Sequence, residues 1–75
     1  MNSQKIHIGR LIREKMKEER RSVIWLADEI GCERDAVYKI FDKQSIDVDL
    51  ILRISIALKI NFFCYYSDYY RDKYG

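Results

Sequence analysis

The stretch that decides the fold runs from Ser22 to Phe41 and reads S-V-I-W-L-A-D-E-I-G-C-E-R-D-A-V-Y-K-I-F. Ser22 is a good N-cap, because its hydroxyl oxygen can accept a hydrogen bond from a backbone N–H in the first turn of a helix. Gly31 can take the left-handed conformation that ends a helix sharply. The stretch therefore predicts two short helices joined by a tight turn. Their apolar stripes are Val23, Leu26, Ala27 and Ile30 in the first helix, and Ala36, Val37, Ile40 and Phe41 in the second.

A turn this short forces the two helices to cross at a large angle, which leaves the outer face of the second helix free. That arrangement is typical of a helix-turn-helix, in which the second helix enters the major groove of DNA. The predicted motif covers residues 22–42.

Length and composition indicate one small helical domain. The chain has 75 residues, no proline and three glycines, and it is 48% hydrophobic and 35% charged, so it is globular rather than disordered. A chain of this size buries only about 60% of its unfolded surface. No alternating apolar run is bounded by hairpin turn signals. The sequence therefore predicts an all-α fold over residues 1–75, a compact bundle of four to five short helices.

Two further helices are expected to flank the motif. The first should run from about Ile6 to Glu19 after a frayed tail at residues 1–4. The two helices of the motif are then the second, which ends near Ile30, and the third, from about Glu33 to Asp42. After the connection at residues 43–46, Asp47 can cap a fourth helix. The core-facing positions are predicted to be Ile8, Leu11, Ile12 and Met16 in the first helix, and Val48, Ile51, Leu52, Ser55 and Leu58 in the fourth.

The C-terminal segment, residues 62–75, is rich in aromatic residues. Asn61 can cap a fifth helix from Phe62 to about Tyr69. One interpretation is that Phe62, Phe63 and Tyr66 close the core beneath the first and fourth helices. Another is that the remaining tyrosines form a dimer or partner surface, since tyrosine is enriched at interfaces; these are Tyr65, Tyr69 and Tyr70. Stacking on bases is disfavoured, because the segment lacks interleaved Arg and Lys.

Charge is spread unevenly along a chain whose formal net charge is +2. Residues 1–21 carry a net charge of +4, and residues 22–75 a net charge of −2. The N-terminal excess is either the solvated face of the first helix or a cluster that lies beside a phosphate backbone.

Few residues point to catalysis, a metal or a membrane. Cys32 and Cys64 are isolated, so they predict no metal site and no disulfide framework, and we expect them to be reduced and partly buried. His7 is expected to be an ordinary surface residue near a frayed end. There is no Ser/His/Asp set and no Gly-rich phosphate loop, which argues against an enzyme, a cofactor or a small-molecule substrate. Apolar runs are too short for a bilayer and no signal peptide is present, so a cytoplasmic protein is expected.

The outer face of the third helix carries the candidate base-reading residues. Arg34 and Lys39 can donate to guanine O6 and N7 or to phosphate, and Tyr38 can pack on a thymine methyl group. Asp35 can accept from cytosine N4, whereas Glu33 and Asp35 can alternatively serve as caps in the first turn. The expected phosphate contacts flank this helix: Arg21, Ser22, Lys43, Gln44 and Ser45, through side chains and backbone N–H groups.

The whole pattern resembles the phage-repressor or Xre-type helix-turn-helix family, a lambda-repressor-like fold. The resemblance covers about Ile8 to Phe63. It rests on Ile12-Arg13-Glu14-Lys15, then Ser22 and Leu26-Ala27, the turn Ile30-Gly31-Cys32, the positions Arg34, Val37 and Ile40, and the run L-R-I-S-I-A-L from Leu52 to Leu58. The resemblance implies a DNA-binding regulator whose third helix lies in the major groove.

Some positions depart from the family. Glycines that commonly follow the first, third and fourth helices are Arg20, Lys43 and Lys59 here. A non-glycine residue in a left-handed conformation costs about 1 kcal/mol, so these loops are expected to differ in shape. Trp25 replaces the capping-box glutamate, and Val23 replaces the polar residue that follows the N-cap.

Two hypotheses therefore stand. The first is a sequence-specific regulator that binds double-stranded DNA as a homodimer, on half-sites about one helical turn apart. The second is a protein-interaction or dimerisation module on the same fold with little DNA binding, which would use the aromatic tail and the extra apolar positions Leu50 and Ile56.

Overall fold

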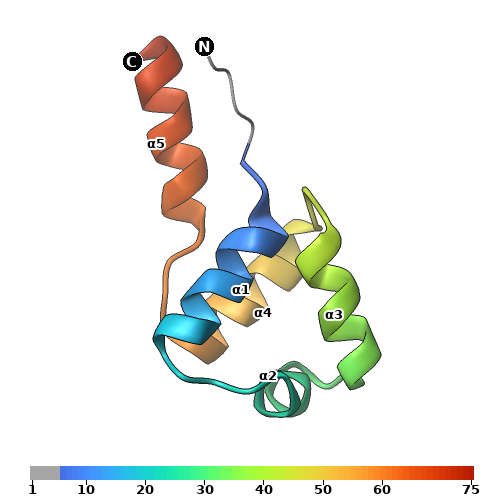
Figure 1. Cartoon of the computed structure of the whole chain (residues 1–75). Coiled ribbons are helices and arrows are strands. Elements are labelled where there is room, and N and C mark those ends of the chain that lie inside the picture. The colour runs from blue at the N-terminus through green and yellow to red at the C-terminus, as the bar shows by residue number, and fades with distance from the viewer. Residues whose placement is uncertain (1–5) are drawn as a thin grey trace.

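The computed structural model describes residues 6–75, which form five helices and no strand. Figure 1 shows α1 and α4 crossing at the centre, α2 and α3 beside them, and α5 standing away from the other helices. The predicted all-α bundle is confirmed, while the tail predicted at residues 1–4 lies outside the described residues. The helices are α1 (Ile8–Glu18), α2 (Val23–Ile30), α3 (Arg34–Asp42), α4 (Val48–Leu58) and α5 (Phe63–Tyr74).

Local capping chemistry sets where most helices begin. The hydroxyl of Ser22 accepts from the backbone N–H of Trp25 at 3.0 Å, and the carboxylate of Asp47 accepts from Leu50 at 2.7 Å, as predicted. His7 also caps a helix, since its Nδ1 accepts from the backbone N–H of Arg10 at 3.1 Å. His7 therefore has a structural role at the surface as the N-cap of α1, which begins at Ile8 rather than Ile6.

Three helices are followed by a residue in the left-handed conformation. Gly31 has φ 73°, as predicted, and ends α2. Arg20 and Lys59 have φ values of 57° and 59°, so these positions keep the left-handed conformation without glycine. The expectation of differently shaped loops is wrong at these two residues. The left-handed conformation destabilises the fold by about 1 kcal/mol at each of them. Lys43, by contrast, is extended, with φ −88°.

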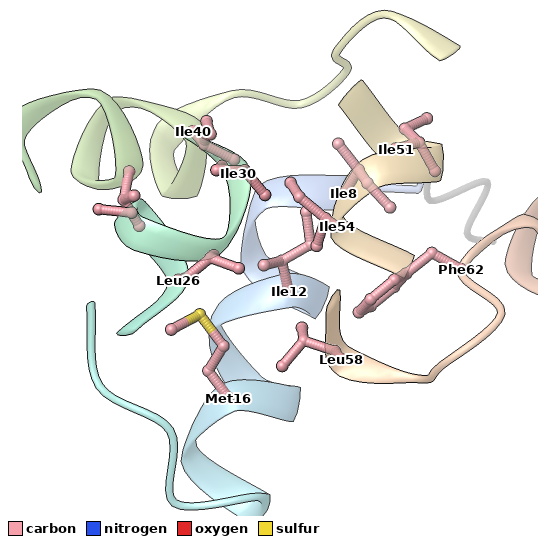
Figure 2. Packing of buried hydrophobic residues seen from close by; sticks show 12 residues of the cluster. Ile8, Ile12, Met16, Leu26, Ile30, Ile40, Ile51, Ile54, Leu58 and Phe62 are labelled. Carbon is pink, nitrogen blue, oxygen red and sulfur yellow. The ribbon is translucent and has the colours of Figure 1, made fainter. Parts of the chain in front are cut away.

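The core joins the first four helices and the residue that precedes α5. Figure 2 shows these side chains converging between α1, α2, α3 and α4. On α4 the buried line is Ile51, Ile54, Ser55 and Leu58, because a helix buries positions three and four residues apart. Twelve hydrophobic residues are buried: Ile8, Ile12, Met16, Leu26, Ala27, Ile30, Val37, Ile40, Ile51, Ile54, Leu58 and Phe62.

Three predicted core positions lie differently. Val48 and Leu52 are exposed, because they lie on a second line of α4 that turns away from the bundle. Leu11 is only half-buried on α1, and Leu50, predicted as a spare apolar position, packs partly against the core.

The C-terminal segment supplies one core residue and then leaves the bundle. Phe62 is fully buried, and its backbone N–H donates to the hydroxyl of Ser55 at 3.3 Å. Phe63 and Tyr66 pack partly against the core, so the core-closing interpretation is confirmed for all three. However, α5 contains no buried residue and continues to Tyr74, five residues beyond the predicted end. Cys64 is consequently exposed rather than partly buried, whereas Cys32 is half-buried as predicted.

A close contact fixes α1 against the end of α3. The backbone N–H groups of Ile8 and Gly9 donate to the carbonyl oxygens of Gln44 and Lys43, each at 3.0 Å. A Cβ atom at Gly9 would collide with the carbonyl oxygens of Ile40, Phe41 and Lys43. Glycine is therefore required here for a close approach of two backbones, and the contact sets the path of the loop that follows α3.

Candidate nucleic-acid interface

The turn between α2 and α3 is held from both sides. Gly31 adopts the left-handed conformation, and the backbone N–H of Cys32 donates to the carbonyl of Ala27 at 2.9 Å. From α4, the guanidinium of Arg53 donates to the carbonyl of Ile30, the last residue of α2. Such a bond satisfies one of the carbonyls that a helix C-terminus leaves without an intrahelical partner. The turn thus holds α3 in one orientation.

The outer face of α3 brings together all four predicted base-reading residues. Arg34, Asp35, Tyr38 and Lys39 are exposed and lie at positions i, i+1, i+4 and i+5 of one helix. The opposite face is anchored, since Val37 and Ile40 are buried. We call these four residues the α3 patch. Figure 1 shows that α3 lies at the margin of the bundle, with no other helix outside it.

Packing orients the tyrosine of the α3 patch. The ring of Tyr38 contacts that of Phe41 edge to face, with centroids 6.1 Å apart and an interplanar angle of 89°. Phe41 itself packs against the core. Tyr38 is still 56% exposed, so one ring edge rests on the protein while the remainder stays accessible to a ligand.

The charges of the α3 patch are open to a partner. Within residues 6–75 the ion pairs are Lys15–Glu18 and Arg71–Asp68, neither of which involves α3. The guanidinium of Arg34 and the ammonium of Lys39 therefore keep their donors for other acceptors.

The two acids near the start of α3 occupy different positions relative to the helix N-terminus. Glu33 occupies the N-cap position, but its side chain makes no capping hydrogen bond, so the capping interpretation is wrong for this residue. Asp35 lies in the first turn, where a carboxylate is favoured by the positive end of the helix dipole. Both acids are exposed, and both would repel a phosphate placed beside them.

At the start of α2, Arg21 and Ser22 are exposed. The oxygen of Ser22 is occupied by the Trp25 N–H, which leaves the hydroxyl hydrogen free to donate. The guanidinium of Arg21 lies 4.4 Å from the centroid of the Trp25 ring, a cation–π contact that holds it in place. Arginine stacked in this way keeps N–H donors at its edge for an anion.

The connection after α3 offers side chains more than backbone donors. Lys43, Gln44 and Ser45 all have exposed side chains. The N–H of Lys43, however, donates to the carbonyl of Ile40 at 3.0 Å, which leaves the side chain of this residue for a phosphate. The carbonyls of Lys43 and Gln44 are bound to the start of α1, which places the three side chains on a fixed backbone.

The predicted partner surface lies on α5, apart from the α3 patch. Tyr65 is half-buried and stacks on Phe62, with centroids 6.1 Å apart. Tyr69 is half-buried, whereas Tyr70 is 65% exposed. Burial raises the pKa of the neighbouring Tyr66 above its ordinary value.

Three residues that position this surface were not predicted from the sequence: His7, Gly9 and Arg53. An isolated glycine inside a helical pattern is a usable signal, since it indicates a close backbone approach. The contacts of Arg53 join segments far apart in the sequence, so no local pattern indicated them.

Comparison with known proteins adds no relative: no family model matches the chain, and neither a curated protein nor a solved structure matches it. None of the described helices is long and apolar enough to cross a membrane. Among residues 6–75, no three His, Cys, Asp or Glu side chains gather where they could hold a metal ion.

Proposed function

We propose that the protein is a cytoplasmic, sequence-specific DNA-binding transcriptional regulator of the phage-repressor type, which binds double-stranded DNA as a homodimer. The observation that supports this most is the α3 patch. Its four polar side chains are adjacent and exposed on a short helix whose opposite face is locked into the core. A helix presented in this way can enter the major groove, which is wide enough to admit it.

Each residue of the α3 patch has a role that follows from its donors and acceptors. Arg34 binds guanine through O6 and N7, for which the planar guanidinium offers two parallel N–H groups. Lys39 donates to guanine or to a phosphate, and Tyr38 packs on a thymine methyl group. Asp35 accepts from cytosine N4, the base contact open to a carboxylate.

Phosphate contacts on both sides set the depth of α3 in the groove. Arg21 and Ser22 precede it, and the side chains of Lys43, Gln44 and Ser45 follow it. One copy neutralises few phosphates, and each phosphate neutralised releases counterions and adds affinity. Useful affinity therefore requires two copies on half-sites about one helical turn apart.

A protein-interaction module is the second candidate, and the charge around α3 favours it. Residues 33–43 hold three acids, Glu33, Asp35 and Asp42, and three bases, Arg34, Lys39 and Lys43. A surface with no excess positive charge gains little from counterion release. Exposed aliphatic residues on α4 are a further feature of an interaction surface.

Binding to a mixed-sequence duplex at low salt separates the two candidates. A DNA-binding protein should show affinity that falls steeply as the salt concentration rises, even without its specific site. Arg34→Ala and Lys39→Ala should weaken that affinity, whereas Arg13→Ala removes another exposed arginine, on α1, and serves as the matched control. No binding at low salt would favour the interaction module, and equal losses in all three variants would contradict the assignment of the DNA contacts to α3.

A further inference from the structure

The outer face of α4 carries an unpartnered apolar stripe. Val48, Leu52 and Ile56 follow one another at intervals of four residues, and their exposed fractions are 68%, 46% and 67%. We call these three residues the α4 stripe. Single exposed aliphatic residues are common on proteins, but adjacent ones usually mark a binding surface.

The α4 stripe borders a shallow hollow where α4 leads into α5. Leu52, Ile56, Ile60 and Phe63 form its apolar walls, and Ser55, Lys59 and Asn61 also line it. A row of side chains four residues apart forms a ridge, and helices commonly pack by placing such ridges in the grooves of another helix. The surface thus has both parts of a helix-packing contact, a ridge and a hollow beside it.

Charge along α4 indicates which partner fits. The N-terminal end carries the exposed acids Asp47 and Asp49, and the C-terminal end carries the exposed Lys59. Arg53, the other base, is bound to the carbonyl of Ile30. A second α4 in parallel would place like charges together, whereas an antiparallel one places acids beside lysine. The helix dipoles also favour the antiparallel arrangement.

We propose that the α4 stripe binds a second copy of the chain, with the two α4 helices antiparallel about a two-fold axis at Leu52. In this pairing, Val48 of one copy meets Ile56 and the hollow of the other. Ridges of this type cross at about −50°. In this pairing Asp49 of the second copy and Lys59 lie toward the same end of the contact, so opposite charges are brought together there.

The aromatic tail is the competing dimer surface, and it offers less. Tyr65 and Tyr69 are half-buried against their own chain. The rings of Tyr70 and Tyr74 contact each other, with centroids 5.4 Å apart. The side chains of Asp68 and Arg71 already pair within α5 at 2.7 Å. The tail therefore offers two exposed tyrosines, Tyr70 and Tyr74, whose rings already contact each other, whereas the α4 stripe offers a continuous row of three exposed aliphatic residues.

This inference rests on the proposed function only for its role on DNA, because self-association can be measured without DNA. A chain that associates through α4 but does not bind DNA would refute the proposed function alone. A chain that binds DNA as a dimer formed through another surface would refute the inference alone.

Sedimentation equilibrium of the full chain is the test, at concentrations up to about 1 mM because small interfaces bind weakly. Wild type should reach a monomer–dimer equilibrium, and Ile56→Lys should weaken it at least about tenfold, since it places a charge in the contact. Ile24→Lys is the matched control: Ile24 is 58% exposed on α2, and its replacement should leave association unchanged. Tyr70→Ser should also leave it unchanged.

Charge reversal tests the antiparallel direction. Asp49→Lys alone and Lys59→Asp alone should each weaken association, and the double variant should restore it. Circular dichroism confirms that each variant is folded. A monomeric wild type, association unaffected by Ile56→Lys, a double variant that fails to recover, or dissociation caused by Tyr70→Ser would each overturn the proposal.

Discussion

Replacing Gly9 by alanine should destabilise the domain, although this change usually stabilises a helix. Alanine is favoured over glycine by about 1 kcal/mol in a helix interior. Here, however, the added Cβ would lie 2.6 Å from the carbonyl oxygen of Phe41 and 2.7 Å from that of Lys43, with the carbonyl of Ile40 also in collision. These are backbone atoms, so they cannot rotate away as a flexible side chain would. The start of α1 must move away from the end of α3.

The size of the effect follows from three contributions. Overpacking of a well-packed site costs about 1–3 kcal/mol. Movement also weakens the hydrogen bonds from Ile8 and Gly9 to the carbonyls of Gln44 and Lys43, each worth about 0.5–1.5 kcal/mol. After the helix-propensity gain of about 1 kcal/mol is subtracted, the net loss should be about 1–5 kcal/mol. A domain of this length has a total stability of about 4–11 kcal/mol, so the change is large.

Urea denaturation followed by far-UV circular dichroism measures this loss. Gly31→Ala is the matched control, because the nearest side-chain atom to its added Cβ is 3.8 Å away, in Arg53, and no backbone collides. Its cost should be about 1 kcal/mol, from the left-handed backbone alone. Gly31→Asn should recover part of that cost, since asparagine tolerates this conformation. A Gly9→Ala variant as stable as wild type would refute the close contact between α1 and α3.

Three further outcomes follow from burial. Leu26→Ala should cost about 2–5 kcal/mol, because Leu26 is fully buried, and an unchanged melting temperature would contradict the position of α2. Truncation after Ser67 should cost about 1 kcal/mol or less by urea denaturation, because no residue of α5 is buried; a larger loss would mean that the tail is part of the core. Burial raises the pKa of Tyr66, so the folded state binds the phenolic proton more tightly than the unfolded state does. The contribution of this proton to folding stability is complete below the ordinary tyrosine pKa, and it is lost as the pH rises through the higher pKa of the folded state. The free energy of unfolding of Tyr66→Phe should therefore fall less than that of wild type between about pH 9 and 11. Equal losses would contradict the attribution of this pH dependence to Tyr66.

Features that depend on neighbouring residues could be predicted from the sequence. The caps at Ser22 and Asp47 and the left-handed Gly31 follow from side-chain chemistry within a few residues. Helical periodicity also places Arg34 and Lys39 on one face of α3, opposite Val37.

Features that depend on contacts between distant parts of the sequence could not be predicted. Both Ile51-Ile54-Leu58 and Val48-Leu52-Ile56 are apolar lines with helical spacing, and only the positions of α1 and α2 decide which line is buried. The length of α5 escaped prediction for a different reason, since no glycine or proline marks its end before Gly75. Contacts of the loop after α3 with α1 join residues more than thirty positions apart, so no local pattern indicated that the carbonyls of Lys43 and Gln44 bind the start of α1.

Selection from a pool of randomised duplexes tests most directly the claim that α3 reads DNA sequence. Wild type should enrich a two-fold repeated motif whose half-sites lie about one helical turn apart. The double variant Arg34→Ala, Lys39→Ala should lose that enrichment, and Arg13→Ala should keep it. An unenriched pool from wild type, or the same motif from the double variant, would contradict the account.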